Sequence, residues 1–139
     1  MRYLIEPEVA GGWGGHTVAD TSRHPPLVSK LHYQFDGWQG DDLLESFPCF
    51  IVSESLRDGL IAAGITGFEI DEVEISKSEE FSSDAALGDL PKFFWLKIVD
   101  DELSADVGIS SDYRMSISER ALNVFRKYNI GHADIAPSS

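Results

Sequence analysis

The chain contains an internal repeat, which restricts its possible folds more than any other feature of the sequence. Residues 52–70 (VSESLRDGLIAAGITGFEI) align without a gap with residues 117–135 (ISERALNVFRKYNIGHADI). Self-similarity of this kind indicates that one supersecondary unit is used twice. The two units span residues 50–75 and 115–136, and each is predicted to be a strand, a helix and a strand.

Signals for the start and the end of a helix fall at aligned positions of the repeat. Ser53 and Ser118 are predicted N-caps, and a glutamate follows each of them at the positive end of the helix. Gly64 and Asn129 align at the other end, and these residue types most readily adopt the left-handed conformation that closes a helix. Small residues in the apolar stripe of the first helix align with large ones in the second, so we expect the helices to pack in different environments.

Alternating apolar and polar residues, or short continuous apolar runs, predict further strands. These strands cover residues 2–6, 31–36, 50–52, 68–75, 93–99 and 113–117. In the fourth of these segments the alternation changes phase, and a bulge near Asp71 would keep its apolar side chains on one face.

The remaining segments are expected to be turns and loops. Residues 11–15 are rich in glycine and residues 16–26 have the composition of a loop, so residues 1–30 are expected to be a loop-rich N-terminal segment. The chain of 139 residues is predicted to be one domain, 1–139, of the α+β class. Its sheet is expected to be mostly antiparallel or mixed and covered mainly on one side.

Charge narrows the range of partners. The chain has 24 acidic and 11 basic residues, which gives a formal net charge of −13. Such a field repels nucleic acids and anionic membranes, whereas it attracts a basic protein. The same acidity would also serve solubility alone, and both interpretations stay open. The sequence therefore argues against partners that are nucleic acids or membranes.

The N-terminus and the single cysteine favour the cytoplasm. Residues 1–8 lack the basic segment, the apolar stretch and the cleavage site of a secretory signal. Cys49 is the only cysteine, so no disulfide can form within the chain. Because its neighbours Phe47, Phe50 and Ile51 are apolar, Cys49 is predicted to be a buried residue that reacts slowly with thiol reagents.

No set of residues with catalytic or metal-binding spacing was found in the sequence. His16, His24, His32 and His132 lack the spacing of metal ligands, although the fold can still bring some of them together with acids. The glycines at residues 11–15 do not open a helix, so they do not form a dinucleotide-binding fingerprint. The sequence predicts no catalytic residue, no metal and no cofactor.

Acidic clusters and aromatic residues in glycine-rich turns are the candidates for binding a partner. A strand that carries carboxylates opposite an apolar face would present them together, and an aromatic ring can anchor an interface. The candidate partner-binding residues are Glu69, Asp71, Glu72, Glu74, Trp38, Asp100, Asp101 and Glu102.

Several motifs resemble immunity proteins that are encoded beside bacterial polymorphic toxins. The motifs are FDGW at residues 35–38, GDDLLESFP at 40–48, LPKFFWL at 90–96 and SISERAL at 116–122. The last is similar to the strand followed by a Val-Ser-Glu-Arg-Ala-Leu helix that recurs in one group of these proteins. In the first repeat, Ser55 and Leu56 replace the Arg-Ala of that pattern.

The resemblance implies a small cytosolic protein of interbacterial competition. Such a protein is not an enzyme and neutralises a cognate toxin domain by binding to it. Two alternatives stay open: a small hydrolase-like enzyme that uses loop histidines and acids, and a self-associating module such as a homodimer.

Overall fold

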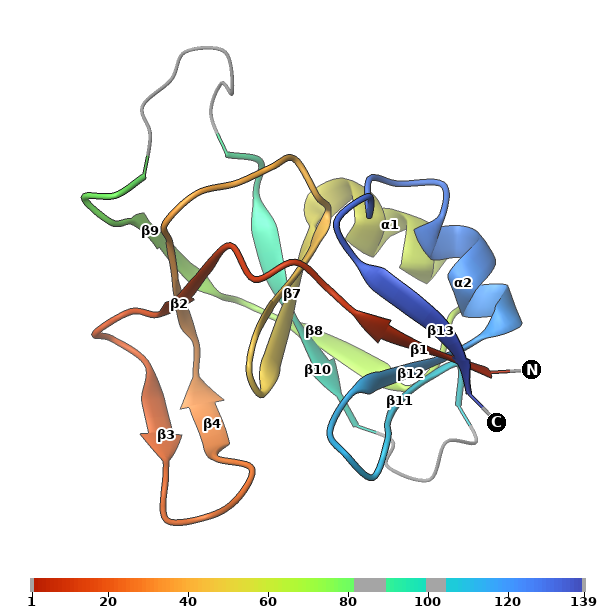
Figure 1. Cartoon of the computed structure of the whole chain (residues 1–139), viewed down its shortest axis with the longest axis horizontal. Helices are drawn as coiled ribbons and strands as arrows, with labels where there is room; N and C mark the ends of the chain where they lie inside the picture. Colours follow the sequence, from red (N-terminus) through yellow and green to blue (C-terminus); the bar gives the residue numbers. More distant parts are fainter. Residues whose placement is uncertain (1, 82–89, 100–104, 139) are drawn as a thin grey trace.

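The described part of the chain, residues 2–81, 90–99 and 105–138, is mostly β-structure with two short helices in this computed structural model (Figure 1). Its sheets are mostly antiparallel. The central sheet has the order β6 (Leu43–Ser46), β7 (Cys49–Ser53), β10 (Phe93–Ile98), β8 (Phe68–Asp71). The terminal sheet has the order β11 (Val107–Ile109), β12 (Met115–Ser118), β1 (Arg2–Glu6), β13 (Asp134–Ser138).

A smaller sheet and a hairpin lie beside the central sheet. The side sheet has the order β2 (Gly11–Trp13), β5 (His32–Phe35), β9 (Glu74–Lys77), and its β5–β9 pair is parallel. The hairpin consists of β3 (Val18–Asp20) and β4 (Leu27–Lys30), and it lies at the lower left of Figure 1. The segment 1–30, expected to be loop-rich, thus carries four strands.

Glycine explains why β2 was not predicted. Glycine normally weakens a strand because it has no side chain to pack, but a Cβ atom at Gly11 would lie 1.9 Å from the Gln34 carbonyl oxygen of the neighbouring strand. Glycine is therefore needed there for the close approach of two backbones. The glycines of residues 11–15 suggested a loop, but Gly11 is needed for the close approach of β2 to β5.

Both helices connect strands that lie in the same sheet. α1 (Glu54–Ala62) links β7 to β8, and α2 (Glu119–Phe125) links β12 to β13. One antiparallel strand separates the linked strands in each case, β10 in the central sheet and β1 in the terminal sheet.

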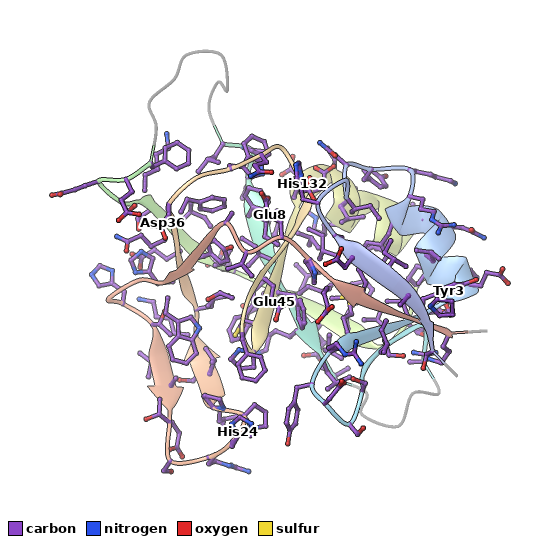
Figure 2. The ribbon with its side chains drawn as sticks, in the orientation of Figure 1. Tyr3, Glu8, His24, Asp36, Glu45 and His132 are labelled. Atoms are coloured by element: carbon purple, nitrogen blue, oxygen red, sulfur yellow. The ribbon has the colours of Figure 1, made fainter. Side chains whose placement is uncertain are left out.

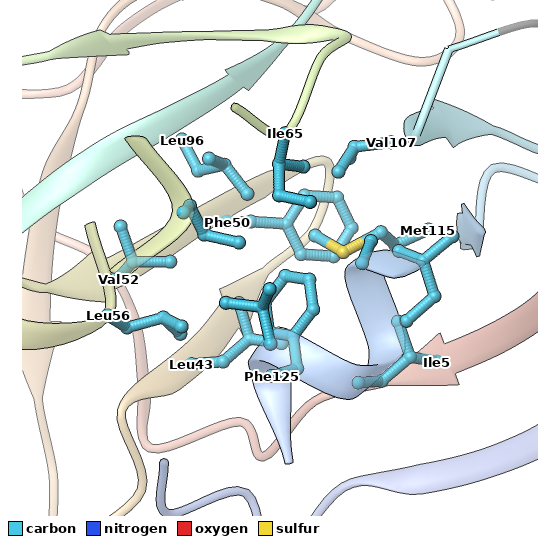
Figure 3. Close-up of a cluster of buried hydrophobic side chains, with 14 of the residues drawn as sticks. Ile5, Leu43, Phe50, Val52, Leu56, Ile65, Leu96, Val107, Met115 and Phe125 are labelled. Atoms are coloured by element: carbon cyan, nitrogen blue, oxygen red, sulfur yellow. The ribbon is translucent and has the colours of Figure 1, made fainter. Parts of the chain in front are cut away.

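The central sheet is buried on both faces, so the expectation of a sheet covered mainly on one side is wrong. Phe93, Phe94, Trp95 and Leu96 on β10 are at most 9% exposed. Phe94 and Leu96 pack into a first core with the helices and the terminal sheet (Figure 3). Phe93 and Trp95 pack into a second core against the side sheet. A continuous apolar run is typical of a strand covered on both sides.

The helices start where the sequence predicted. Ser53 Oγ accepts a hydrogen bond from the Leu56 amide at 3.3 Å, and Ser118 Oγ accepts one from the Ala121 amide at 3.0 Å. These contacts confirm both serines as N-caps. Each satisfies an amide group that a helix start leaves without a partner.

The helix ends follow the prediction only in part. Gly64 has the expected left-handed conformation, with φ of +69°. Among the described residues Tyr113 is the only non-glycine residue with positive φ, so the same expectation for Asn129 is wrong. Asn129 instead donates its amide to Asp42 Oδ2 at 2.8 Å and its side chain to the Gly40 carbonyl at 2.9 Å.

The two helices pack against each other. A Cβ atom at Gly59 of α1 would lie 2.1 Å from the hydroxyl of Tyr128, which follows α2. The small residue in one helix therefore makes room for a large residue beside the other. This fit of a small residue to a large one is complementary packing between the two helical units.

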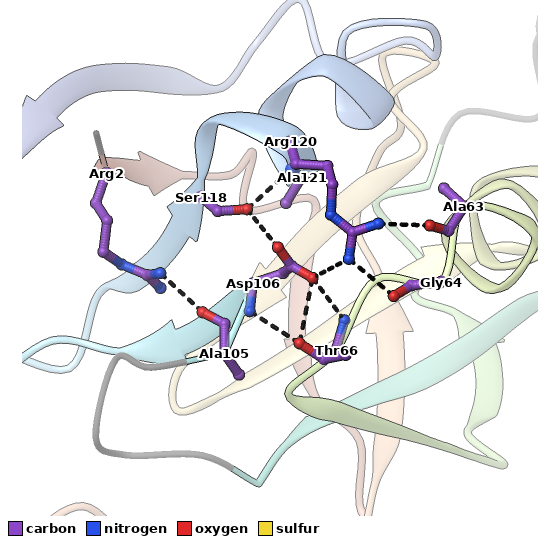
Figure 4. Close-up of polar contacts among 9 residues, drawn as sticks. All are labelled: Arg2, Ala63, Gly64, Thr66, Ala105, Asp106, Ser118, Arg120 and Ala121. Atoms are coloured by element: carbon purple, nitrogen blue, oxygen red, sulfur yellow. Dashed lines mark hydrogen bonds and ion pairs between the residues drawn. The ribbon is translucent and has the colours of Figure 1, made fainter.

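Two aspartates join the helical units through similar hydrogen bonds. Ser118 Oγ donates to Asp106 Oδ1 at 2.7 Å, and the Thr66 amide donates to Asp106 Oδ2 at 3.1 Å (Figure 4). Ser53 Oγ likewise donates to Asp42 Oδ1 at 2.7 Å. Each aspartate thus holds the N-cap serine of one helix and the loop that follows the other helix.

Arg120 extends the network of Asp106 but not that of Asp42. Its guanidinium group donates to Asp106 Oδ2 and to the carbonyls of Ala63 and Gly64, at the C-terminal end of α1 (Figure 4). Burial opposes ionisation of Asp106, but the hydrogen bonds from Arg120, Ser118 and Thr66 outweigh it and lower its pKa to about 2.

Candidate functional site

The β8 edge carries three of the predicted acidic residues. Glu69, Asp71 and the following Glu72 are exposed. β8 pairs with β10, and no other strand within residues 2–81, 90–99 and 105–138 pairs with it. Lys97 Nζ on β10 donates to Asp71 Oδ2 at 3.4 Å. The acids outnumber the bases on this edge, and their strand is anchored by its apolar face in the first core.

Glu74 lies on a different sheet from these residues. The sequence predicted one bulged strand over residues 68–75, but the chain leaves the central sheet after Asp71 and continues as β9 in the side sheet. His16 Nδ1 lies 2.6 Å from Glu74 Oε2, and Lys30 Nζ lies 3.5 Å from Oε1. The hydrogen bond with His16 lowers the pKa of Glu74. Glu74 is therefore a locally paired carboxylate.

A surface hollow nevertheless brings three of the four acids together. Its volume is about 360 Å³, and Asp71, Glu72 and Glu74 line it together with Lys30 and Trp95. We call these five residues the acidic hollow. Trp95 itself is 5% exposed and packs in the second core, so the hollow has a rigid apolar wall. Glu69 is not among the residues that line it.

Trp38 has a structural role. The other predicted acidic residues lie outside the described part of the chain. The indole of Trp38 packs edge-to-face on Phe93, with ring centroids 6.2 Å apart. Its Nε1 donates to the Asp41 carbonyl at 2.9 Å. Trp38 is thus half-buried at the edge of the second core. Asp100, Asp101 and Glu102 fall in the segment 100–104, which the structure does not describe.

A group of aromatic side chains on the surface was not among the residues predicted from the sequence. His24 lies between β3 and β4 (Figure 2), and its ring is 5.4 Å from that of Tyr113 and 6.2 Å from that of Phe47. Phe47 is 44% exposed. The three residues come from separate turns, so no local pattern in the sequence could have predicted the group. Aromatic residues of this kind are enriched in protein interfaces.

His32 and Ser76 are close but lack the chemistry of a catalytic pair. His32 Nε2 lies 2.7 Å from Ser76 Oγ. The His16 amide donates to His32 Nδ1 at 3.1 Å, so Nδ1 carries no proton and the neutral ring carries it on Nε2. A protonated Nε2 donates to the serine and cannot remove its proton.

A second histidine is oriented by a buried carboxylate. His132 Nδ1 lies 2.8 Å from Asp41 Oδ1, and the His132 amide donates to Asp41 Oδ2 at 2.9 Å. The side chain of Asp41 is fully buried, whereas that of His132 is 45% exposed. The hydrogen bond with Asp41 raises the pKa of His132. Glu8 joins this pair (Figure 2), and both burial and the charge of Asp41 raise its pKa.

Three potential nucleophiles among the described residues, Cys49, Ser53 and Ser118, have structural roles. Cys49 is 4% exposed, and burial raises the pKa of its thiol to about 12, as expected for a core residue. Ser53 and Ser118 are N-caps. The arrangement supports binding through carboxylates better than it supports covalent chemistry.

Comparisons with known proteins give no assignment. No protein-family model matches the chain, and a search of the curated proteins found no match. Within the described residues, neither helix is long and apolar enough to cross a membrane.

Proposed function

We propose that this protein is an immunity protein that binds a cognate basic toxin domain and neutralises it by stoichiometric occlusion. The observation that carries the proposal is the acidic hollow on a chain with a net charge of −13. The motif resemblance of the sequence supports the same class. The protein would act in the cytoplasm in interbacterial competition, without a cofactor, and would bind neither nucleic acid nor membrane.

The acidic hollow is suited to a basic partner for two physical reasons. Asp71 ends a strand that is fixed in the central sheet, and Glu74 lies on a strand of the side sheet, so little conformational entropy would be lost on binding. The net negative charge would speed encounter with a basic surface. Carboxylates of the hollow would pair with lysine and arginine side chains that the toxin needs for its own substrate.

We also infer that residues 50–75 and 115–136 are two related units. In both sheets the strand before the helix and the strand after it flank one antiparallel strand. The aspartate that holds each N-cap serine also accepts from the loop after the other helix. The interlocked arrangement supports a duplicated unit whose two copies are packed together.

A second candidate function is a small enzyme, and the Asp41–His132 pair favours it. A buried carboxylate that orients a half-exposed imidazole resembles the arrangement of a general base. Turnover of a substrate by the purified protein, lost in His132→Gln, would favour this function. A third candidate is self-association through the β8 edge, for which the measurement is the dependence of molar mass on protein concentration.

The test of the proposed function uses a matched pair of charge reversals. In Asp71→Lys/Glu72→Lys the acidic hollow loses its two carboxylates that do not contact His16. Glu79→Lys/Glu80→Lys changes the net charge equally at exposed positions outside the hollow. The protein tested as the toxin is the product of the neighbouring reading frame, and the measurements are its neutralisation and the association rate at several salt concentrations.

We expect the hollow variant to lose neutralisation and the control variant to retain it. Association of the unchanged protein should slow as salt rises, while dissociation should change less. If the two variants neutralise equally well, the hollow is not the interface. The exposed group of His24, Phe47 and Tyr113 would then be the next surface to test, with Phe47→Ala.

A further inference from the structure

Three side chains that can bind a metal ion converge from distant parts of the chain. Glu8 follows β1, Asp41 precedes β6, and His132 lies between α2 and β13. One ligand atom from each residue lies within 4.8 Å of the ligand atoms of the other two. Figure 2 shows Glu8 and His132 near the end of the sheets where α2 leads into β13.

The cluster holds more carboxylate oxygen than its hydrogen-bond donors can satisfy. His132 supplies a donor to each oxygen of Asp41, whose side chain is fully buried. Glu8 Oε2 is also buried and has no hydrogen-bond partner among the described residues. A buried carboxylate oxygen without a partner is costly, and such an atom calls for an ion, a proton or a water molecule.

We propose that Glu8, Asp41 and His132 bind one divalent transition-metal ion of the Zn²⁺ type. Two carboxylates and one neutral imidazole balance the charge of a divalent cation, and this mixture of nitrogen and oxygen ligands suits zinc better than calcium or magnesium. His132 Nδ1 and Asp41 Oδ1, 2.8 Å apart, now share a proton. The cation takes the place of that proton, and the ring binds it through Nδ1 as a neutral imidazole with its proton on Nε2: an imidazolium releases one proton to solvent, and a neutral ring moves its proton from Nδ1 to Nε2. The cation also gives Glu8 Oε2 its missing partner.

The binding site has access to solvent and a mechanical role. Glu8 also lines a surface hollow of about 330 Å³ beside Trp38, which offers the ion an entry path. The half-exposed side chain of His132 leaves room for water to complete the coordination. The cation would tie the β1–β2 connection, the turn before β6 and the loop after α2 together. This site is separate from the acidic hollow and does not depend on the proposed function.

A second cluster with similar residue types provides the control. His16, His32 and Glu74 also lie within 4.8 Å of one another. Each oxygen of Glu74 already has a cationic or donor neighbour, Lys30 at 3.5 Å and His16 at 2.6 Å. Both ring nitrogens of His32 are already in hydrogen bonds, Nδ1 with the His16 amide at 3.1 Å and Nε2 with Ser76 Oγ at 2.7 Å, so neither is free to bind a cation. This cluster satisfies itself without a cation.

Calorimetric titration of the chelator-treated protein with ZnCl₂ tests the proposal. The unchanged protein should bind one equivalent, and Zn²⁺ should raise its thermal midpoint. Glu8→Gln and His132→Gln should each weaken binding at least tenfold, which corresponds to about 1.4 kcal/mol or more. His16→Gln, the matched control in the other cluster, should bind within twofold of the unchanged protein.

Glu8→Gln is the decisive variant because it removes a buried charge and keeps the shape of the side chain. Its far-ultraviolet circular dichroism and its metal-free thermal midpoint show whether the fold is retained. The proposal is overturned if the unchanged protein binds no Zn²⁺. It is also overturned if a folded Glu8→Gln binds as tightly as the unchanged protein, or if only His16→Gln loses binding.

Discussion

Asp42 and Asp106 hold equivalent places in the two helical units, but only Asp106 is paired with an arginine. Each accepts from an N-cap serine at 2.7 Å and from a backbone amide of the loop that follows the other helix. Arg120 adds an ion pair to Asp106, and the aligned residue of the first unit is Ser55. The two units therefore share the backbone arrangement around the aspartate, but only the Asp106 network includes an arginine that reinforces it.

Arg120 also links α2 to the C-terminal end of α1. Arg120 lies on α2 and donates to the carbonyls of Ala63 and Gly64 at the end of α1. The end of α2 is held differently, by the amide side chain of Asn129 on the Gly40 carbonyl. A helix end needs partners for its last carbonyl groups, and a cation there also opposes the helix dipole favourably. We therefore expect the Asp106 network to contribute more stability than the Asp42 network.

Replacing the two aspartates tests that difference with the largest expected effect. Asp106→Ala should lower the free energy of unfolding by about 3 kcal/mol, because it leaves Arg120, Ser118 and Thr66 without their acceptor. Asp42→Ala should lower it by about 2 kcal/mol, because no arginine loses a partner. Urea denaturation of both variants gives the two values. Equal losses would show that Arg120 adds nothing measurable.

Acid should weaken the Asp106 network in a defined pH range. The pKa of Asp106 is about 2 in the folded protein and 3.8 in the reference state, so its contribution is present above about pH 4 and is lost as the pH falls through 2. The contribution is about 2 kcal/mol for a shift of this size. The difference in stability between the unchanged protein and Asp106→Asn should shrink over this range. A constant difference between pH 5 and pH 2 would contradict the assignment.

The two N-cap serines should differ less than the two aspartates do. Ser53→Ala and Ser118→Ala should each lower stability by about 1 kcal/mol, because each removes one cap and one donor to an aspartate. Neither change should alter the affinity of the folded protein for a partner. Thermal unfolding and binding measured on the same samples separate the two effects. Lost binding at normal stability would identify the serine as an interface residue.

The smallest effect is expected from copying the arginine into the first unit. Ser55 is exposed at the position that aligns with Arg120, next to the N-cap serine that binds Asp42. Ser55→Arg should raise stability by up to about 0.5 kcal/mol through an exposed ion pair with Asp42, and salt should reduce the gain. Ser55→Gln is the control for side-chain size. A gain of the same size in the control would exclude an ion pair.

Local sequence determined the elements whose signals lie within one segment. The caps at Ser53 and Ser118 were predictable because an N-cap serine bonds to an amide only three residues away. β1 and the central strand β10 were predictable from their apolar patterns. The net charge of −13 and the burial of Cys49 likewise follow from the residues themselves and their immediate neighbours.

Only the tertiary structure decided which residues meet across long separations. The chain changes sheets after Asp71 because the apolar side chains of β8 and β9 complete two different cores, which a pattern within one segment cannot specify. For the same reason the acidic hollow includes Glu74 but not Glu69. The approach of His132 to Asp41 spans 91 residues and depends on how the loop after α2 packs beside the turn before β6. The spacing of residues along the chain does not predict such contacts, since they form only when the sheets and helices bury their apolar faces together.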